Sequence, residues 1–382
     1  MGFKSQHATN SKLDDAAGVV ENDLNYICEN LAEEFPNLSG KRLLITGGAG
    51  FLGHYLVQSA LQWNRRAKGA PPIRLTVYDS YVRGIPAWLQ RLRQDENLKL
   101  VQHDMTQPLP AGMDDFAYII HAASIASPTY YRRYPIETMD ANVNGLRALL
   151  EHAREQARRN CPVEGFLFFS SSEIYGDPAA DSIPTPETYR GNVSCTGPRA
   201  CYDEAKRYGE TLCVNFAQHV GIPVKVARPF NNYGPGLKIT DRRVLPDFAR
   251  DVLAGRDLVM FSDGSPKRTF CYVADAVVGY YKILVKGRSG EAYNIGVEEP
   301  EISVRELAEM VVAQARELFE YAGKVVRQPS RDQDYLLDNP NRRCPVIAKA
   351  RGELGYNPTV SFEEGLRRSL LWYRDNEVAE EA

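Results

Sequence analysis

Lys41-Arg-Leu-Leu-Ile-Thr-Gly-Gly-Ala-Gly-Phe-Leu-Gly53 is the stretch that decides the fold. Its apolar residues predict a short buried strand, and residues 54–63 predict a helix after it. Between the two, glycines recur at every third position, as Gly47, Gly50 and Gly53. The first allows a tight turn, the second lets the backbone approach a pyrophosphate, and the third lets the helix pack on the strand. Because a helix N-terminus presents free N–H groups to phosphates, the segment predicts a dinucleotide site.

The next predicted strand, residues 73–78, ends at Asp79. A carboxylate at this point can hold both ribose hydroxyls of NAD and would repel the 2′-phosphate of NADP. The cation of nearby Arg83 argues the other way but is the weaker signal, so we expect NAD as the cofactor. The residues expected to contact it are Gly47, Gly50, Phe51, Leu52, Gly53, Asp79, Asp104, Met105, Ala122, Ala123, Tyr202 and Lys206.

Three more predicted strands keep the same rhythm, at residues 98–102, 116–120 and 166–169, with helices between them. The clearest helix spans residues 135–158. Strands that alternate with helices form a parallel sheet with crossovers, and ligands bind at the carboxyl ends of such strands. The sequence therefore predicts an α/β fold, a Rossmann-type doubly wound parallel sheet with a smaller C-terminal α/β substrate lobe.

The chain is expected to have an N-terminal extension, a dinucleotide domain and a substrate lobe. Their predicted bounds are 1–40 for the extension, 41–229 with a return at 270–295 for the dinucleotide domain, and 230–269 with 296–382 for the lobe. Within the lobe we expect helices at residues 302–319 and 362–376, a strand near Val325 and a frayed C-terminal tail.

The N-terminal extension is expected to be partly disordered, at residues 1–10, and to contain one amphipathic helix at residues 19–35. It lacks the basic start and apolar core of a signal peptide. We expect the helix to pack on the dinucleotide domain or on a neighbouring subunit. Its predicted apolar face comprises Val20, Leu24, Ile27, Leu31 and Phe35.

Tyr202 and Lys206 are the strongest catalytic candidates. Their spacing of four places the phenol and the ammonium on one helical face, one turn apart. A free Tyr has a pKa of about 10, and a cation one turn away is expected to lower it. Such a Tyr can take a proton from a hydroxyl while hydride leaves the same carbon. The pair means little alone, but the upstream dinucleotide motif makes it significant.

From residue 41 to residue 373, the chain resembles the extended short-chain dehydrogenases/reductases that act on nucleotide sugars, and among them the UDP-glucuronic acid decarboxylases. Four motifs carry the resemblance: Ser127-Pro128 with Tyr134-Pro135-Ile136, Gly197-Pro-Arg-Ala-Cys-Tyr-Asp-Glu204, Arg228-Pro-Phe-Asn-Asn-Tyr-Gly-Pro235 and Arg268-Thr-Phe-Cys-Tyr-Val-Ala-Asp275. The resemblance implies a homodimer formed through the helices at 135–158 and 199–219.

The cluster Ser171-Ser172-Glu173 distinguishes the subclasses of this family. The resemblance implies that Ser171, where decarboxylases usually carry Thr, hydrogen-bonds the sugar 4-hydroxyl. Sugar 4,6-dehydratases place Asp-Glu at the next two positions, and here Ser172 replaces that Asp. Decarboxylases keep Ser-Glu, as this chain does. The alternatives are a nucleotide-sugar 4,6-dehydratase or a UDP-glucuronate 4-epimerase and, more remotely, a non-catalytic dinucleotide-binding scaffold.

The implied reaction is an NAD-dependent decarboxylation of UDP-glucuronic acid to UDP-xylose through a UDP-4-keto intermediate. C4 oxidation makes a β-keto acid, CO2 leaves, C5 is protonated and C4 is reduced again. The catalytic residues implied are Ser171, Glu173, Tyr202, Lys206 and Arg343. Arg343 is preferred to Arg342 as the cation at the C5–C6 region.

The resemblance also implies the residues that bind the UDP-sugar substrate: Asn231, Arg243, Val244, Arg268 and Arg343. Arg268 suits the diphosphate, because a guanidinium binds phosphate oxygens bidentately. The segment Val244-Leu-Pro246 resembles the dehydratases instead, which leaves uracil and thymine both open as the base.

Composition bounds the remaining function classes. The 382 residues carry a net charge of -3, so nothing suggests nucleic acid or an anionic membrane as a partner. No apolar run is long enough to span a bilayer. The 7 cysteines form no C-x-x-C pair and the 6 histidines lack metal-ligand spacing. We therefore expect a cytoplasmic enzyme with reduced thiols and no metal.

Overall fold

The computed structural model describes residues 15–328 and 340–376. The disorder expected at residues 1–10 and the fraying expected at the C-terminal tail both fall outside these ranges. A central parallel sheet of seven strands has the order β11-β6-β5-β4-β1-β2-β3. Its strands are β1 (Arg42–Thr46), β2 (Arg74–Asp79), β3 (Leu98–Gln102), β4 (Tyr118–His121), β5 (Gly165–Phe169), β6 (Val224–Pro229) and β11 (Ala292–Ile295).

The chain reverses its direction of travel across the sheet between β1 and β4, which are direct neighbours. In doubly wound sheets this switch point opens a crevice at the carboxyl ends of the strands. The predicted Rossmann-type fold is confirmed, and the predicted strands agree with the observed ones to within about two residues.

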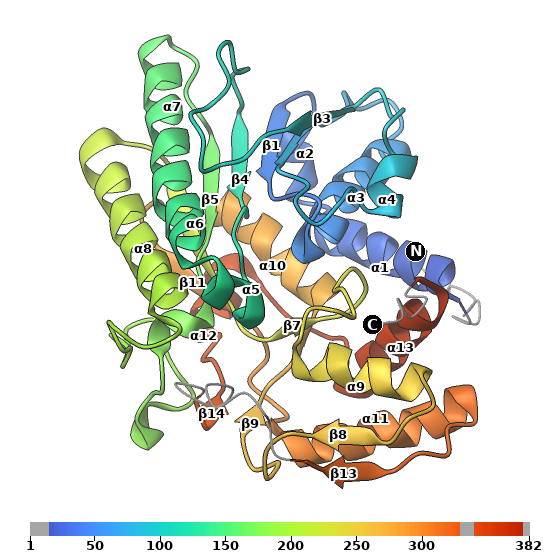
Figure 1. Ribbon diagram of the computed structural model, residues 1–382. Helices are drawn as coiled ribbons and strands as arrows, with labels where there is room; N and C mark the ends of the chain where they lie inside the picture. Colours follow the sequence, from blue (N-terminus) through green and yellow to red (C-terminus); the bar gives the residue numbers. More distant parts are fainter. Residues whose placement is uncertain (1–14, 329–339, 377–382) are drawn as a thin grey trace, which may run out of the picture.

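Helices cover both faces of the sheet (Figure 1). One face carries α6 (Pro135–Asp140), α7 (Leu146–Arg158) and α8 (Ala200–Val220), and the other carries α3 (Phe51–Arg66) and α10 (Val273–Lys286). Two short helices, α4 (Ala87–Arg91) and α5 (Pro128–Arg133), lie in the loops after β2 and β4. The helix predicted at 135–158 is interrupted by a π turn at Ala141–Gly145, where a side chain on Gly145 would press on the Met105 carbonyl.

A smaller lobe stands below the carboxyl ends of the strands (Figure 1). Its elements are α9 (Val244–Leu253), β8 (Leu258–Met260), β9 (Lys267–Arg268), β12 (Ile302–Ser303), α11 (Val304–Phe319), β13 (Val325–Arg327), β14 (Arg342–Arg343) and α13 (Phe362–Asn376), with β7 (Asn232–Tyr233) and β10 (Cys271–Tyr272) at its junction with the sheet. The helix α12 (Ala348–Leu354) instead packs on α10 and β11 of the sheet domain. The helices expected at 302–319 and 362–376 are present.

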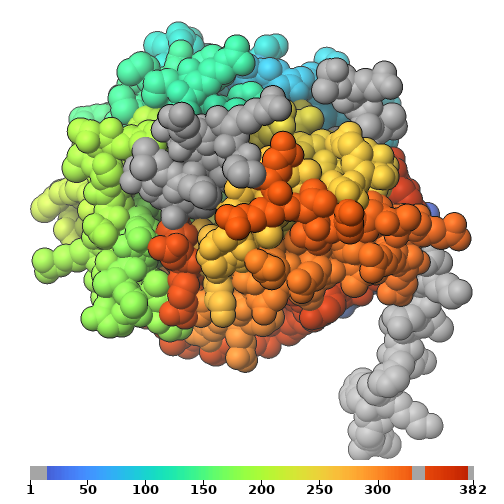
Figure 2. Space-filling model, turned by 60° about the horizontal axis from the view of Figure 1, so that its bottom comes forward, coloured from blue at the N-terminus to red at the C-terminus, as the bar shows by residue number. Residues whose placement is uncertain are grey.

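β14 ties this lobe to the sheet domain. It pairs with β9 in parallel, and the next segment forms a bridge between Thr185 and Pro345. Figure 2 shows this red segment between the green residues of the sheet domain and the yellow-orange residues of the lobe. The strand thus carries Arg342 and Arg343 into the boundary between the two parts.

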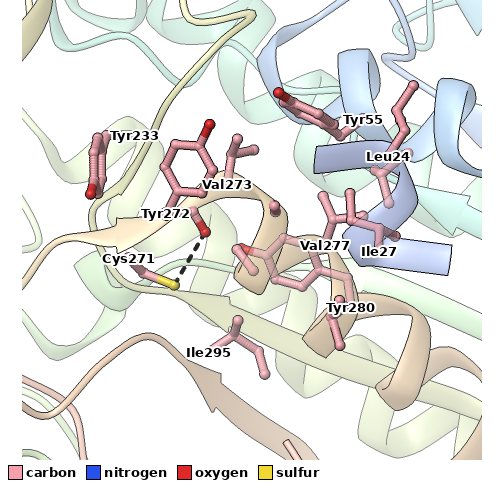
Figure 3. Close-up of a cluster of buried hydrophobic side chains, with 14 of the residues drawn as sticks. Leu24, Ile27, Tyr55, Tyr233, Cys271, Tyr272, Val273, Val277, Tyr280 and Ile295 are labelled. Carbon is pink, nitrogen blue, oxygen red and sulfur yellow. Dashed lines mark hydrogen bonds between the residues drawn. The ribbon is translucent and has the colours of Figure 1, made fainter. Parts of the chain in front are cut away.

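The N-terminal extension packs on its own chain. Its helix α1 (Ala16–Asn30) contacts α3, α10 and α13, and a short helix α2 (Phe35–Leu38) follows. Leu24 and Ile27 point into the aromatic cluster around Tyr272 (Figure 3). The predicted apolar face is correct except at one position, since Val19 is fully buried and Val20 is not.

Candidate active site

A cavity of about 1330 Å3 lies at the carboxyl ends of the central strands, between the sheet and the smaller lobe. All the residues predicted for the site line it, namely Gly47, Gly50, Phe51, Leu52, Gly53, Asp79, Asp104, Met105, Ala122, Ala123, Ser171, Glu173, Tyr202, Lys206, Asn231, Arg243, Val244, Arg268 and Arg343. The fold therefore brings the glycine loop after β1 and the distant strand β14 to one cavity.

The glycine loop joins β1 to α3 with almost no spare room. Gly47 has φ +71°, and a Cβ there would lie 2.7 Å from the backbone of Ala123. A Cβ on Gly53 would lie 2.2 Å from the carbonyl oxygen of Gly48. The Asp79 carboxylate, at the end of β2, also holds the loop by accepting a hydrogen bond from the Ala49 N–H at 3.0 Å. The carboxylate itself is oriented by the Tyr81 N–H, which donates to it at 2.9 Å.

Gly53→Ala is expected to lower both cofactor content and stability, because its methyl group would collide with rigid backbone rather than with a movable side chain. Overpacking of this kind costs about 1–3 kcal/mol. Bound dinucleotide in purified protein and the melting temperature measure the effect. Gly352→Ala is the matched control, since nothing lies within 4 Å of its Cβ position. It should leave the dinucleotide content unchanged, and the melting temperature should not fall, because Ala favours a helix interior such as that of α12. Equal dinucleotide content in the two variants would contradict the close packing.

Unpartnered polar atoms in the cavity wall indicate that the site is built for a ligand. Among the described residues, the hydroxyls of Ser124 and Ser170 and the Nε2 atom of His103 are buried without a hydrogen-bond partner, and all three side chains line the cavity. Buried polar groups in proteins are nearly always satisfied. Together with the glycine loop and the Asp79 carboxylate, they fit a dinucleotide.

Tyr202 and Lys206 lie on one face of α8, as predicted, but their electrostatics differ from the expectation. Burial raises the pKa of Tyr202 to about 12, although the Ser171 hydroxyl opposes this by hydrogen bonding. Burial also lowers the pKa of Lys206 to about 7. Its ammonium donates to the Phe169 carbonyl at 2.6 Å and lies 5.6 Å from the Tyr202 ring centre. The predicted lowering of the Tyr202 pKa is therefore wrong, because desolvation outweighs the distant cation.

The Tyr202 ring is held flat against a second aromatic ring that the sequence analysis did not identify. Tyr131, from α5, stacks on it with ring centres 5.1 Å apart and an interplanar angle of 15°. The Tyr131 hydroxyl is buried and makes no hydrogen bond among the described residues. On the other side, Ser171 caps the turn that follows β5, accepting from the Glu173 N–H at 3.2 Å. The turn places Ser171 and Glu173 at the same end of the cavity.

Glu173 is bound by two arginines. The Nη2 atom of Arg343 donates to its Oε2 atom at 3.0 Å, and Arg199 donates to the same oxygen. Partial burial would raise the pKa of Glu173, but Arg199, Arg343 and Arg268 together lower it to about 2. Arg342, the alternative candidate, pairs with Glu301 instead and does not line the cavity.

Arg199 is the functional candidate that the sequence analysis missed. It lies within the Gly197–Glu204 motif, three residues before Tyr202, and it lines the cavity. Its position, three residues before the predicted catalytic Tyr, is the sequence feature that could have marked Arg199 as a site residue. Its contact with Glu173 joins two segments that are distant in sequence, so no local pattern could show it.

The remaining predicted residues also line the cavity. Arg268 donates to the Lys267 carbonyl at 2.8 Å, and burial together with Arg343 lowers its pKa to about 10. The Asn231 side chain donates to the Thr269 carbonyl at 2.9 Å. Arg243 immediately precedes Val244 at the start of α9, and it pairs with Asp241 at 2.9 Å.

The part of the chain that surrounds the dinucleotide site matches a known family model. Residues 43–296 match the NAD dependent epimerase/dehydratase family. Among curated proteins, the chain is 36% identical over 331 residues to UDP-glucuronic acid decarboxylase 3 of Arabidopsis thaliana, covering 87% of each chain. It is 34% identical over 334 residues to UDP-glucuronic acid decarboxylase 1 of Xenopus tropicalis, covering 87% of this chain and 72% of that protein.

Solved structures of similar fold include enzymes of related chemistry. An epimerase from Methanothermobacter thermautotrophicus has a TM-score of 0.74 and 28% identity, covering 91% of this chain and 96% of its own. A dTDP-glucose 4,6-dehydratase from Streptomyces venezuelae, solved with NAD bound, has a TM-score of 0.74 and 26% identity, covering 87% and 97%. Family model, relatives and cavity agree: the chain belongs to the NAD dependent epimerase/dehydratase family.

Proposed function

We propose that this protein is an NAD-dependent UDP-glucuronate decarboxylase that forms UDP-xylose. The observation that carries the proposal is the Glu173–Arg343 ion pair, which lies in the same cavity as Tyr202, with Ser172 at the position where dehydratases carry an acid. The matching curated relatives are UDP-glucuronic acid decarboxylases, which supports the same substrate. A scaffold without catalysis would have no need of this set of groups.

The cavity residues divide into a cofactor half and a sugar half. The glycine loop, Asp79, Ala122 and Ala123 would hold the dinucleotide, which supplies a reversible acceptor for the C4 hydride. Asp104 and Met105 would flank its adenine end. We further propose that residues 230–269 and 296–382 act as the nucleotide-sugar lobe, with Arg268 and Asn231 on the diphosphate and with Arg243 and Val244 near the base.

Tyr202 takes the proton of the C4 hydroxyl as that carbon is oxidised. Ser171 and Tyr202 then donate hydrogen bonds to the C4 oxygen, where negative charge develops as the C5–C6 bond breaks. The electron pair of that bond moves toward the C4 ketone, CO2 leaves and a proton is added to C5. Arg343 would hold the leaving carboxylate, and Glu173 would hold the water that delivers this proton. The hydride held by the dinucleotide would then return to C4 while Tyr202 returns its proton to the C4 oxygen, which gives UDP-xylose and leaves the cofactor unchanged. Lys206 keeps α8 anchored through the Phe169 carbonyl.

The direct test is incubation of the purified protein with UDP-glucuronate, followed by measurement of CO2 and by mass spectrometry of the product. We expect CO2 and a UDP-pentose, with bound NAD extracted unchanged from the same preparation. A product of unchanged mass that behaves as UDP-galacturonate would show a 4-epimerase instead. Conversion of dTDP-glucose with loss of water would show a 4,6-dehydratase, the alternative suggested by Val244 to Pro246.

We also propose that the protein is a homodimer and that it works in the cytoplasm. Exposed apolar side chains gather on α6 and α8, namely Tyr134, Ile136 and Met139 near or on the first helix and Tyr208 and Val220 on the second. Such a face is typical of an association surface. The seven cysteines are all free, which suits a reducing compartment. No helix in the described part of the chain has the length and apolar character needed to cross a membrane.

A further inference from the structure

Two guanidinium groups converge on one carboxylate oxygen in the wall of the cavity. Arg199, at the start of α8, and Arg343, on β14, both donate to Oε2 of Glu173. They come from the sheet domain and the smaller lobe, so the contact spans the boundary between them. The Arg343 residue is only 3% exposed, and the Arg199 side chain is 13% exposed. Glu173 thus occupies a largely buried two-arginine clamp, defined here as Arg199 and Arg343.

The clamp has donors that Glu173 does not use. Nη1 of Arg343 and Nε of Arg199 are buried and make no hydrogen bond among the described residues. The Nε atom of Arg199 has only a longer ion pair, at 3.7 Å, with Asp203. A guanidinium carries five N–H donors in a fixed fork that matches a carboxylate bidentately. Arg343 also donates to the Gly176 carbonyl at 3.2 Å, but the two forks share a single oxygen of Glu173 and keep unused donors for a better-matched carboxylate.

We propose that the two-arginine clamp is the subsite for the carboxylate of the sugar acid, and that Glu173 fills it as an internal substitute until the substrate displaces it. This inference rests on the proposed function and adds Arg199 as a specificity-determining residue. A neutral sugar has no group that can replace Glu173 between two cations. An acidic sugar does, so the clamp selects acids over the corresponding hexoses.

Displacement also changes the state of Glu173. While Arg199 and Arg343 both donate hydrogen bonds to the Glu173 carboxylate, that carboxylate is not available to hold a water molecule near C5. Once the substrate carboxylate takes the clamp, Glu173 is free to hold the water that protonates C5. The group is therefore released only when the substrate that needs it is bound. After CO2 leaves, Glu173 returns to the arginines, and the smaller neutral sugar no longer competes.

Calorimetric titration of Arg199→Met tests the clamp, in a Tyr202→Phe background so that the ligand is not consumed. UDP-glucuronate and UDP-glucose are the two probes, because they differ only at C6. We expect binding of UDP-glucuronate to weaken at least about tenfold, the effect of one lost charge-assisted hydrogen bond. Binding of UDP-glucose should change less than about twofold on the same scale. Arg288→Met, which removes an exposed arginine paired with Glu353, is the matched control.

Glu173→Gln in the same background gives the opposite expectation. An amide holds two guanidinium groups less strongly than a carboxylate. Displacement therefore becomes easier, and UDP-glucuronate should bind several-fold more tightly while UDP-glucose is unaffected. This variant also carries the test if Arg199→Met fails to fold. The rate of CO2 release is measured in Glu173→Gln protein that keeps Tyr202. Tighter binding of UDP-glucuronate together with slower CO2 release would separate occupation of the clamp from catalysis.

Two results would overturn the inference. One is an equal loss of both ligands in Arg199→Met, which would make Arg199 a structural brace. The other is weaker binding of UDP-glucuronate in Glu173→Gln. Failure of the proposed function looks different: wild-type protein would release no CO2, while the selective loss of acid binding in Arg199→Met would persist. CO2 release without that selectivity would reject the clamp and keep the function.

Discussion

Tyr202→Phe lowers the rate of CO2 release from UDP-glucuronate by a factor of roughly 100 to 10,000, the range expected when a general acid–base group is lost. Phe keeps the ring that stacks on Tyr131 at 5.1 Å, so packing in the cavity is preserved. Only the hydroxyl that we propose exchanges a proton with the C4 oxygen is removed. The rate is measured as labelled CO2 released from carboxyl-labelled substrate.

The control for this substitution lies on the same helix. Tyr208 is 47% exposed and does not line the cavity, and Tyr208→Phe should retain wild-type activity. Bound NAD and the melting temperature should be the same in both variants. A Tyr202→Phe protein with more than about a tenth of wild-type activity would lie outside the range for a lost acid–base group and would remove Tyr202 from the mechanism.

The electrostatics of this site could not be predicted from the sequence. Spacing places Tyr202 and Lys206 on one helical face, and that much was correct. Burial depends on how β5, α5 and α8 close around the pair, and it raises the pKa of Tyr202 and lowers the pKa of Lys206. Desolvation of a charged group is a property of the tertiary structure. The helical spacing alone therefore overestimated the influence of the lysine.

The fold was predictable because its signals are local. The glycine loop, the strand that ends at Asp79 and the alternation of strands and helices each lie within short segments. Resemblance then supplied Glu173 and Arg343, which the structure brings into one ion pair. The features that were missed all depend on contacts between distant segments. They are the stacking of Tyr131, the second arginine on Glu173, the π turn before α7 and the burial of Val19.

A second large effect is expected outside the cavity, at Asp23 in the N-terminal helix α1. Asp23 is fully buried and accepts hydrogen bonds from the hydroxyls of Tyr55 and Tyr272 and from Arg368 at 2.6 Å. These partners belong to α3, β10 and α13, so a single side chain ties the extension to three other elements. Figure 3 shows Leu24 and Ile27 of α1 beside Tyr55 and Val277.

Asp23→Ala should lower the free energy of unfolding by about 3–5 kcal/mol, the usual cost of breaking a buried ion pair from one side. Burial raises the pKa of Asp23 even though Arg368 opposes it. A folded-state pKa above the unfolded value means that the charge itself does not favour folding. The contribution must therefore come from the three accepted hydrogen bonds. Without Asp23, the Tyr55 and Tyr272 hydroxyls would lose their buried acceptor, while Arg368 would keep its ion pair with Glu364. Urea denaturation followed by tryptophan fluorescence measures the change.

Glu21→Ala is the matched control, because Glu21 is exposed on the same helix and its loss should have no effect beyond about 0.5 kcal/mol. Hydrogen exchange across residues 16–30 then locates the effect. If α1 is held mainly by Asp23, these amides should exchange faster in Asp23→Ala while bound NAD is retained. Tyr55 and Tyr272 also belong to the main hydrophobic core. We therefore expect amide protection to fall throughout the core, and not in α1 alone. An Asp23→Ala protein as stable as Glu21→Ala would show that apolar packing of Leu24 and Ile27 alone secures the extension.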